Sequence, residues 1–220
     1  MYYYSYSMGK LGIYTKNPRF YYGVIRALKD FGINFISIEN IFEDLKNVDV
    51  VLSSTGDSRI SEKQIFQEDP VRAVRRSFSF FMGKDKFHTI YIGIDPGPKP
   101  GIAVTSNNVV LEAFELFDVG QIRNTVETLI GDYGAEYCSI RVGNGDKPNR
   151  QYILRQILPL GLNVEIINET GTSYPHKTHD NALSAARIAN IEIFQKNGPS
   201  VTAKKRRELI EEEFRTLNNI

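Results

Sequence analysis

The chain has 220 residues, of which 41% are hydrophobic and 24% are charged, and its formal net charge at pH 7 is +1. The length allows one large domain or two small ones. The near-neutral net charge argues against a protein that coats duplex nucleic acid, because such proteins are usually strongly basic. Any contact with nucleic acid would therefore depend on local patches of basic residues. No apolar run approaches the roughly 18 residues that span a bilayer, the first residues lack a signal-peptide pattern, and the single cysteine, Cys138, excludes a disulfide framework. We therefore expect a cytoplasmic protein without a membrane partner.

The first part of the chain alternates short apolar runs with helical segments. Strands are predicted at 10–15, 34–38 and 48–53, with a helix that starts at Asn17-Pro18 and a short helix over 41–45. This βαβαβ order is typical of a small parallel α/β unit. The loop after the first strand lacks the glycine fingerprint of a dinucleotide site. We interpret residues 1–86 as a scaffold or recognition domain.

A third helix in this part carries clustered arginines. Asp69-Pro70 is a cap followed by proline, and it predicts a helix over 71–82. Arg72, Arg75 and Arg76 come together on one side of that helix. A solvated face and a phosphate-contacting face are both consistent with the cluster. The run 83–86 (GKDK) then indicates a domain boundary.

The second part begins with the stretch HTIYIGIDPGPKPGIAVT at 88–105. A buried strand over 89–94 ends at Asp95, and a second strand follows a Gly/Pro-rich turn. Asn107-Asn108 suits a tight hairpin into a third strand over 109–117. A carboxylate at the end of a buried strand suits a metal ion or a phosphate. Asp, Pro and Gly are also the usual turn residues, so a plain turn fits as well.

The order of elements after these three strands limits the topology. Helices are predicted at 122–133, 149–158 and 178–196, and strands at 137–142 and 162–167. The order β-β-β-α-β-α-β-α predicts a mixed five-stranded sheet with helices on both faces, in which two parallel strands are added beside the first by helical crossovers. We assign this domain to 87–198. Residues 199–220 are predicted to form a charged amphipathic C-terminal helix.

Four carboxylates follow elements whose ends meet at one edge of this sheet. They are Asp95, Asp146, Glu169 and Asp180. Carboxylates in one cleft repel one another unless a cation joins them, and their hard oxygen atoms suit Mg²⁺ or Mn²⁺. Two such ions can promote phosphodiester cleavage. Each acid also has a simpler interpretation as a helix cap, a turn residue or a surface carboxylate.

Two histidines, His176 and His179, lie just before Asp180. Either could assist proton transfer or contact the scissile phosphate. A histidine that caps the following helix is an equally good interpretation. His179 is retained as a catalytic candidate beside Asp95, Asp146, Glu169 and Asp180.

The segments GIDPGPKPGIAV, VGNGD, INETGTS and HDNALSAA, in that order, resemble the ribonuclease-H-like superfamily. Within it they look most like the RuvC-type Holliday-junction resolvases and their YqgF-type relatives. The resemblance covers roughly residues 88–197. It implies a two-metal nuclease acting on structured DNA or RNA, with Asp95, Glu169 and Asp180 as metal ligands and Asp95 bridging the ions. A resolvase of this kind would make paired cuts as a homodimer.

Three departures from the family pattern keep a second interpretation open. Asp146 is the candidate where RuvC-type enzymes place a glutamate, and Thr170 replaces the arginine of the YqgF-type motif. The loop after Asp95 is also unusually rich in proline, at Pro96, Pro98 and Pro100, which stiffens the approach to Asp95. A catalytically inactive module of the same fold, which binds nucleic acid or a protein partner, is therefore the alternative. An actin-like ATP-binding protein is less favoured, because the chain has no Gly-Gly pair for an adenosine loop.

Overall fold

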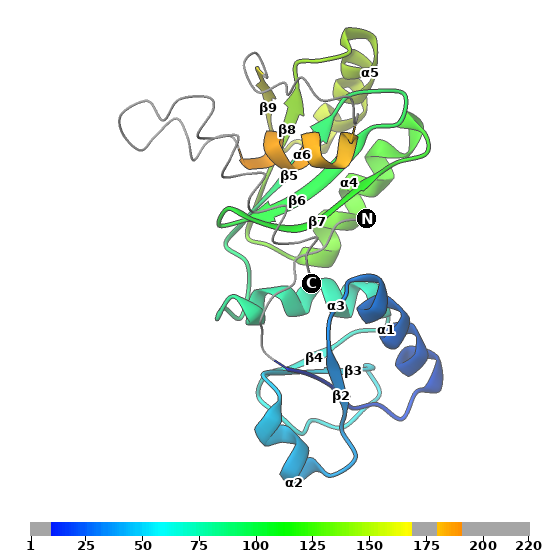
Figure 1. The fold of residues 1–220 in the computed structure, drawn as a ribbon, viewed down its shortest axis with the longest axis vertical. Coiled ribbons are helices and arrows are strands. Elements are labelled where there is room, and N and C mark those ends of the chain that lie inside the picture. The colour runs from blue at the N-terminus through cyan, green and yellow to red at the C-terminus, as the bar shows by residue number, and fades with distance from the viewer. Residues whose placement is uncertain (1–9, 169–179, 191–220) are drawn as a thin grey trace, which may run out of the picture. The chain divides into compact units, whose positions relative to one another are not determined.

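The computed structural model describes residues 10–168 and 180–190 of the chain. Their contacts divide them into two compact units (Figure 1). The N-terminal unit comprises residues 10–87 and 129–136, and the mixed-sheet unit comprises 88–128, 137–168 and 180–190. Glu169, His176, His179 and the expected C-terminal helix within 199–220 lie outside the described residues.

The N-terminal unit is built on a parallel sheet in the order β2-β1-β3-β4. Its strands are β1 (Leu11–Ile13), β2 (Phe35–Ser37), β3 (Val50–Ser53) and β4 (Gln64–Phe66), and its helices are α1 (Pro18–Asp30), α2 (Ile41–Asp44), α3 (Pro70–Phe81) and the 3-10 turn η1 (Leu45–Asn47). The predicted βαβαβ core is confirmed. Strand β4, which pairs in parallel with β3, is an addition that the sequence analysis did not predict.

The mixed-sheet unit has five strands in the order β7-β6-β5-β8-β9. Strands β5 (Thr89–Asp95), β6 (Gly101–Ser106) and β7 (Val109–Glu115) form an antiparallel meander, and β8 (Tyr137–Gly143) and β9 (Asn163–Ile167) add in parallel beside β5. Its helices are α5 (Lys147–Ile157), α6 (Asn181–Asn190) and the first part of α4 (Ile122–Tyr133), whose residues from 129 onward belong to the N-terminal unit, with 3-10 turns η2 (Val119–Gln121) and η3 (Leu158–Leu160). The predicted fold class, strand order and central position of β5 are confirmed.

Local signals explain several of the element boundaries. Asn107 and Asn108 both have positive φ, at 47° and 73°, which is the backbone of a tight hairpin turn between β6 and β7. Asn17 caps α1 by accepting hydrogen bonds from the backbone N–H groups of Arg19 and Phe20. Helix α4 ends before Gly134, whose φ of 58° lies in the left-handed region. These boundaries follow from residues adjacent in sequence.

Helix α6 lies directly on one face of the mixed sheet (Figure 1). A Cβ atom added to Gly93 would lie 2.1 Å from the carbonyl oxygen of Ala185, and one added to Gly101 would lie 1.8 Å from that of Asn181. Glycine at these two positions therefore lets the helix backbone rest on the strands. Small residues complete the contact on both sides, namely Ala103, Val110 and Ala113 from the sheet and Ala182, Ala185 and Ala186 from α6.

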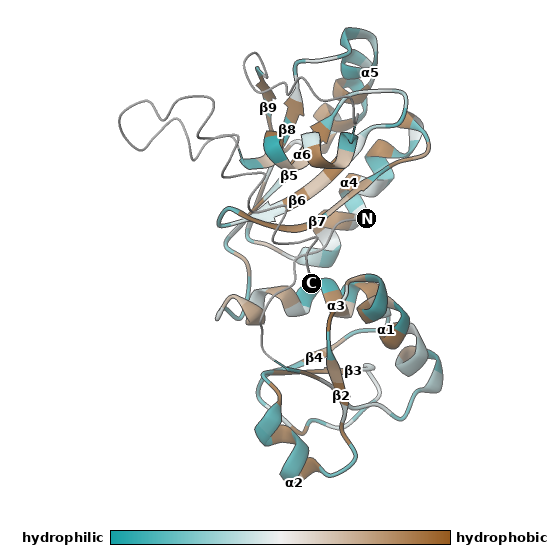
Figure 2. Ribbon diagram, viewed as in Figure 1, coloured by the Kyte–Doolittle hydropathy of each residue, from teal (hydrophilic) through white to brown (hydrophobic). Residues whose placement is uncertain are grey.

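Apolar residues follow the strands of each unit, whereas helices α1 and α3 alternate polar and apolar stretches (Figure 2). Along β5, Ile90, Ile92 and Ile94 are fully buried and alternate with Tyr91, Gly93 and Asp95. Because Gly93 faces α6, the alternation places Asp95 on the same face of the sheet as that helix. No helix in the described part of the chain is both long and apolar enough to span a membrane.

Candidate carboxylate site

Asp95 is the last residue of the central strand of the mixed sheet. It is half-buried and pairs in register with Gly101 at the start of β6. The same Gly101 contacts the backbone of Asn181, the residue that follows Asp180. The structure therefore brings the carboxyl end of β5 and the amino end of α6 to the same edge of the sheet, as the sequence predicted for Asp95 and Asp180.

Asp180 caps helix α6. Its Oδ1 accepts a hydrogen bond of 3.1 Å from the backbone N–H of Leu183, and its carbonyl oxygen accepts one of 3.1 Å from that of Ser184. This is the capping role that the sequence offered as the simpler interpretation. A carboxylate has two oxygen atoms with about four lone-pair sites, so a capping bond does not by itself prevent metal coordination by the same group.

Asp146 has a different environment. It lies three residues beyond the end of β8, is exposed and caps α5. Its Oδ1 accepts a 3.1 Å hydrogen bond from the backbone N–H of Asn149, and its Oδ2 accepts one of 2.8 Å from the Asn149 side chain. These bonds favour the charged form and lower the pKa of Asp146 below its usual range. Both oxygen atoms are engaged in holding the start of α5.

The other predicted site residues, Glu169 and His179, together with His176, fall outside the described ranges. Within 10–168 and 180–190, no group of three or more His, Cys, Asp or Glu side chains is arranged to hold a metal ion. The described part of the chain thus places the backbone segments of Asp95 and Asp180 at the same edge of the sheet. The participation of Glu169 and His179 stays a prediction.

Asn181 and Glu115, which the sequence analysis did not single out, join the elements at this edge. The backbone N–H of Asn181 donates to Glu115 Oε1 at 3.2 Å, and its Nδ2 donates to the carbonyl oxygen of Lys99 at 2.8 Å. Lys99 lies in the loop that follows Asp95. Glu115 could have been found by the reasoning applied to Asp95, because β7 runs parallel to β5 and its terminal acid reaches the same edge.

Arg141 holds the other end of α6. Its side chain is 2% exposed, and its Nη1 donates a hydrogen bond to the carbonyl oxygen of Ala189 in the last turn of the helix. Its Nε lies 3.4 Å from Glu165 Oε2, and its Cζ lies 3.8 Å from the centre of the Tyr91 ring. A cation that binds the last carbonyl groups of a helix stabilises that terminus. Arg141 pairs in register with Gly93 on β5.

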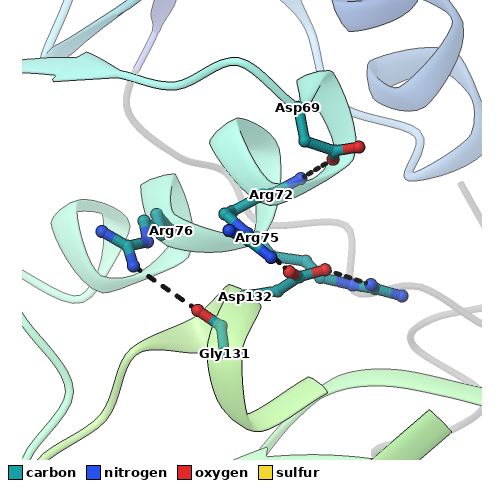
Figure 3. Close-up of polar contacts among 6 residues, drawn as sticks. All are labelled: Asp69, Arg72, Arg75, Arg76, Gly131 and Asp132. Atoms are coloured by element: carbon teal, nitrogen blue, oxygen red, sulfur yellow. Dashed lines mark hydrogen bonds and ion pairs between the residues drawn. The ribbon is translucent and has the colours of Figure 1, made fainter. Parts of the chain in front are cut away.

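The arginine cluster on α3 is neither a solvated face nor a phosphate-contacting face. Arg72 Nε and Arg75 Nη1 each lie 2.8 Å from an oxygen of Asp132, whose side chain is 5% exposed (Figure 3). Arg76 Nη2 donates to the carbonyl oxygen of Gly131 at 3.4 Å. The partner belongs to residues 129–136, which cluster with the N-terminal unit. Both sequence interpretations were wrong, because neither considered a tertiary partner for the arginines.

The loops at the carboxyl edge of the N-terminal sheet are bonded to each other. Asp57 accepts a hydrogen bond from the backbone N–H of Lys16 at Oδ1 and one from that of Ser54 at Oδ2, both 2.8 Å long. Asn17 Nδ2 also donates to the Ser54 hydroxyl at 3.4 Å. Both oxygen atoms of Asp57 are therefore used to fasten the β3 loop to the β1 loop, an arrangement that suits a scaffold.

Cys138 is not a candidate nucleophile. It lies on β8, and burial raises the pKa of its thiol to about 12. Desolvation disfavours the thiolate, which is the reactive form. The thiol therefore stays protonated near neutral pH.

Comparisons with known proteins give matches to separate parts of the chain. Residues 10–81 match the family model of a response regulator receiver-like domain. Among solved structures, RuvC of T. thermophilus in complex with a Holliday junction substrate is similar at a TM-score of 0.37 and 15% identity, covering 48% of this chain and 93% of the other. A Thermus thermophilus RuvC structure is similar at a TM-score of 0.31 and 14% identity, covering 59% and 97%. The chain matches no curated protein at a significant level.

Proposed function

We propose that the mixed-sheet unit is a metal-dependent nuclease that hydrolyses phosphodiester bonds in structured DNA or RNA. One observation carries the proposal. Gly101 pairs with Asp95 and also contacts Asn181, so carboxylates from the central strand and from the start of α6 belong to one edge of the sheet. Ligand sites of open α/β sheets lie at this edge. The strand order and the motifs quoted above agree with a ribonuclease-H-like nuclease.

The donor set fits a hard divalent cation. Asp95 and Asp180 supply carboxylate oxygen atoms, which Mg²⁺ and Mn²⁺ prefer, and we propose Glu169 as the third ligand. We assign Asp146 to the capping of α5, because both its oxygen atoms bind Asn149. When bound, one or two such ions would supply a water nucleophile at neutral pH and neutralise charge on the phosphate.

The residues around the carboxylates have distinct roles in this proposal. The backbone is restricted on both sides of Asp95. Strand β5 precedes it, and the loop that follows contains Pro96, Pro98 and Pro100. His179, next to Asp180 in sequence, is proposed to move a proton to or from the reacting phosphate. Paired cuts in a branched substrate would require a homodimer.

The test is replacement of Asp95 by asparagine in the full-length protein. Asp95→Asn and Asp180→Asn should each abolish Mn²⁺ binding measured by calorimetry. Cleavage of branched DNA or structured RNA should fall by on the order of a thousandfold, since metal ions stabilise the transition state by several kcal/mol. The control is Asp146→Asn, which keeps a good helix cap and should bind Mn²⁺ as the wild type does.

Equal cleavage by the wild type and Asp95→Asn across several substrates would refute the nuclease proposal. Metal-dependent binding of nucleic acid without cleavage by the wild type would instead favour the catalytically inactive module. Loss of Mn²⁺ binding in Asp146→Asn would return that residue to the ligand set.

A further inference from the structure

We propose that Asn181 is a positioning residue, which fixes the first turn of α6 against the Asp95 loop so that Asp95 and Asp180 can share a cation. The inference rests on the proposed metal-dependent function. It assigns a role to a side chain that is not itself a ligand. Asn181 is the first residue of α6 and directly follows Asp180.

Three parts of Asn181 contact three different elements. Its carbonyl group rests on Gly101, the register partner of Asp95. Its side-chain amide donates to the carbonyl oxygen of Lys99 at 2.8 Å, in the loop after Asp95, and its backbone N–H donates to Glu115 Oε1 at 3.2 Å. Asn181 is therefore a direct link between the helix that carries Asp180 and the loop that follows Asp95.

A cation site on two elements needs such a link. Asp95 and Asp180 are 85 positions apart in the chain (180 − 95) and belong to a strand and a helix. Two carboxylates repel each other when no cation is present, and repulsion would favour any movement of the first turn of α6 away from β5. The Asn181 hydrogen bonds oppose that movement. Groups that orient metal ligands in this way typically change metal affinity 10- to 100-fold when they are removed.

The rest of α6 is held independently of Asn181. Arg141 binds the carbonyl oxygen of Ala189 at the far end, and the alanines between them pack on β6 and β7. Loss of the Asn181 side chain should therefore loosen the first turn without detaching the helix. This separation makes the positioning role measurable apart from the stability of the fold.

The experiment compares Mn²⁺ affinity in full-length variants, measured by calorimetry well below the unfolding temperature. Asn181→Leu keeps a similar size but cannot donate to Lys99, and we expect its dissociation constant for Mn²⁺ to rise at least about tenfold. Asn181→Gln keeps an amide donor and should recover part of that loss. Amide exchange at Leu183 should be faster in Asn181→Leu than in the wild type.

The matched control is Asn163→Leu at the opposite edge of the sheet. The Asn163 side chain donates two hydrogen bonds, to Ser139 Oγ at 2.9 Å and to Glu165 Oε1 at 3.1 Å. This variant loses two side-chain hydrogen bonds, whereas Asn181→Leu loses the one to Lys99, and it should nevertheless bind Mn²⁺ as the wild type does. An equal loss of affinity in both variants would indicate a merely structural effect and overturn the positioning role.

The outcomes also separate this inference from the proposed function. If the wild type binds Mn²⁺, Asp95→Asn does not, and Asn181→Leu binds with wild-type affinity, the positioning role is overturned and the metal site stands. If the wild type binds no Mn²⁺, both proposals fail together. A selective loss in Asn181→Leu with partial recovery in Asn181→Gln supports both.

Discussion

Two glycines determine how closely α6 approaches the mixed sheet. At Gly93 an added Cβ would meet backbone and side-chain atoms of Ala185 and Ala189 at 2.1 to 2.8 Å, and at Gly101 it would meet the backbone of Asn181. These neighbours are mainly backbone atoms, which cannot move aside by a rotamer change. The glycines of the GIDPGPKPGIAV motif therefore serve helix packing as well as turn geometry, and through packing they bring Asp180 to the edge where Asp95 lies.

Gly93→Ala should destabilise the protein, because α6 must shift to accommodate the methyl group. Overpacking of this kind costs about 1–3 kcal/mol in the free energy of unfolding, which chemical denaturation can measure. The control is Gly145→Ala in the same unit, where nothing lies within 4 Å of the added atom. Equal stability of the two variants would show that α6 does not rest on β5 at this position.

At the scale of elements, ion pairs and aromatic contacts join α3 to the last turns of α4 within the N-terminal unit. Asp132 lies between the guanidinium groups of Arg72 and Arg75. The next residue, Tyr133, stacks on Phe78 with ring centres 6.3 Å apart. The sequence assigned this helix to the second domain, but its residues from 129 onward cluster with the N-terminal unit.

Asp132→Asn should lower the free energy of unfolding by about 2 kcal/mol. A fully buried pair costs about 3–5 kcal/mol to break, and the value here is smaller because the Arg72 side chain is 43% exposed. Glu127→Gln in the same helix is the matched control. Its pair with Arg123 is exposed, so the change should stay below about 0.5 kcal/mol. Comparable effects of the two substitutions in thermal or denaturant unfolding would contradict the structural role of Asp132.

At the scale of the whole molecule, the charge balance limits how nucleic acid can bind. The chain carries 27 basic and 26 acidic residues outside histidine. The arginine cluster on α3, for which a phosphate-contacting face was one of two interpretations, is bonded to Asp132 and Gly131. If the proposed nuclease function holds, we expect affinity for nucleic acid to depend mainly on the proposed metal site and on few phosphate contacts.

The salt dependence of binding provides the measurement. With one or two phosphate contacts, affinity for a branched DNA or structured RNA should fall only about 3- to 12-fold between 50 and 200 mM salt. Fluorescence anisotropy in the presence of Mg²⁺ would give the slope. A fall of a thousandfold or more would reveal an extended basic surface and would contradict this expectation.

The sequence by itself determined the elements and their order. Asn17 and Asp69 followed by proline start helices, and Asn107-Asn108 turns a hairpin. The alternation of strands and helices leaves few arrangements of the sheet, and the predicted one has β5 in the centre, as observed. These signals are readable because each depends on residues that are adjacent or a few positions apart. The placement of Asp95 at the carboxyl edge of the mixed sheet follows from that order.

Only the tertiary structure decided which side chains meet. Arg72 and Asp132 are 60 positions apart, Glu115 and Asn181 are 66, and Arg141 and Ala189 are 48. Strand β4 is likewise defined by pairing with β3 rather than by its own three residues. Local periodicity carries no information about such partners, because a contact between distant residues depends on strand register and on how closely α6 packs. The sequence could therefore predict the edge at which a site forms, whereas the contacts of Asn181 and Arg141 that hold α6 there emerged from packing.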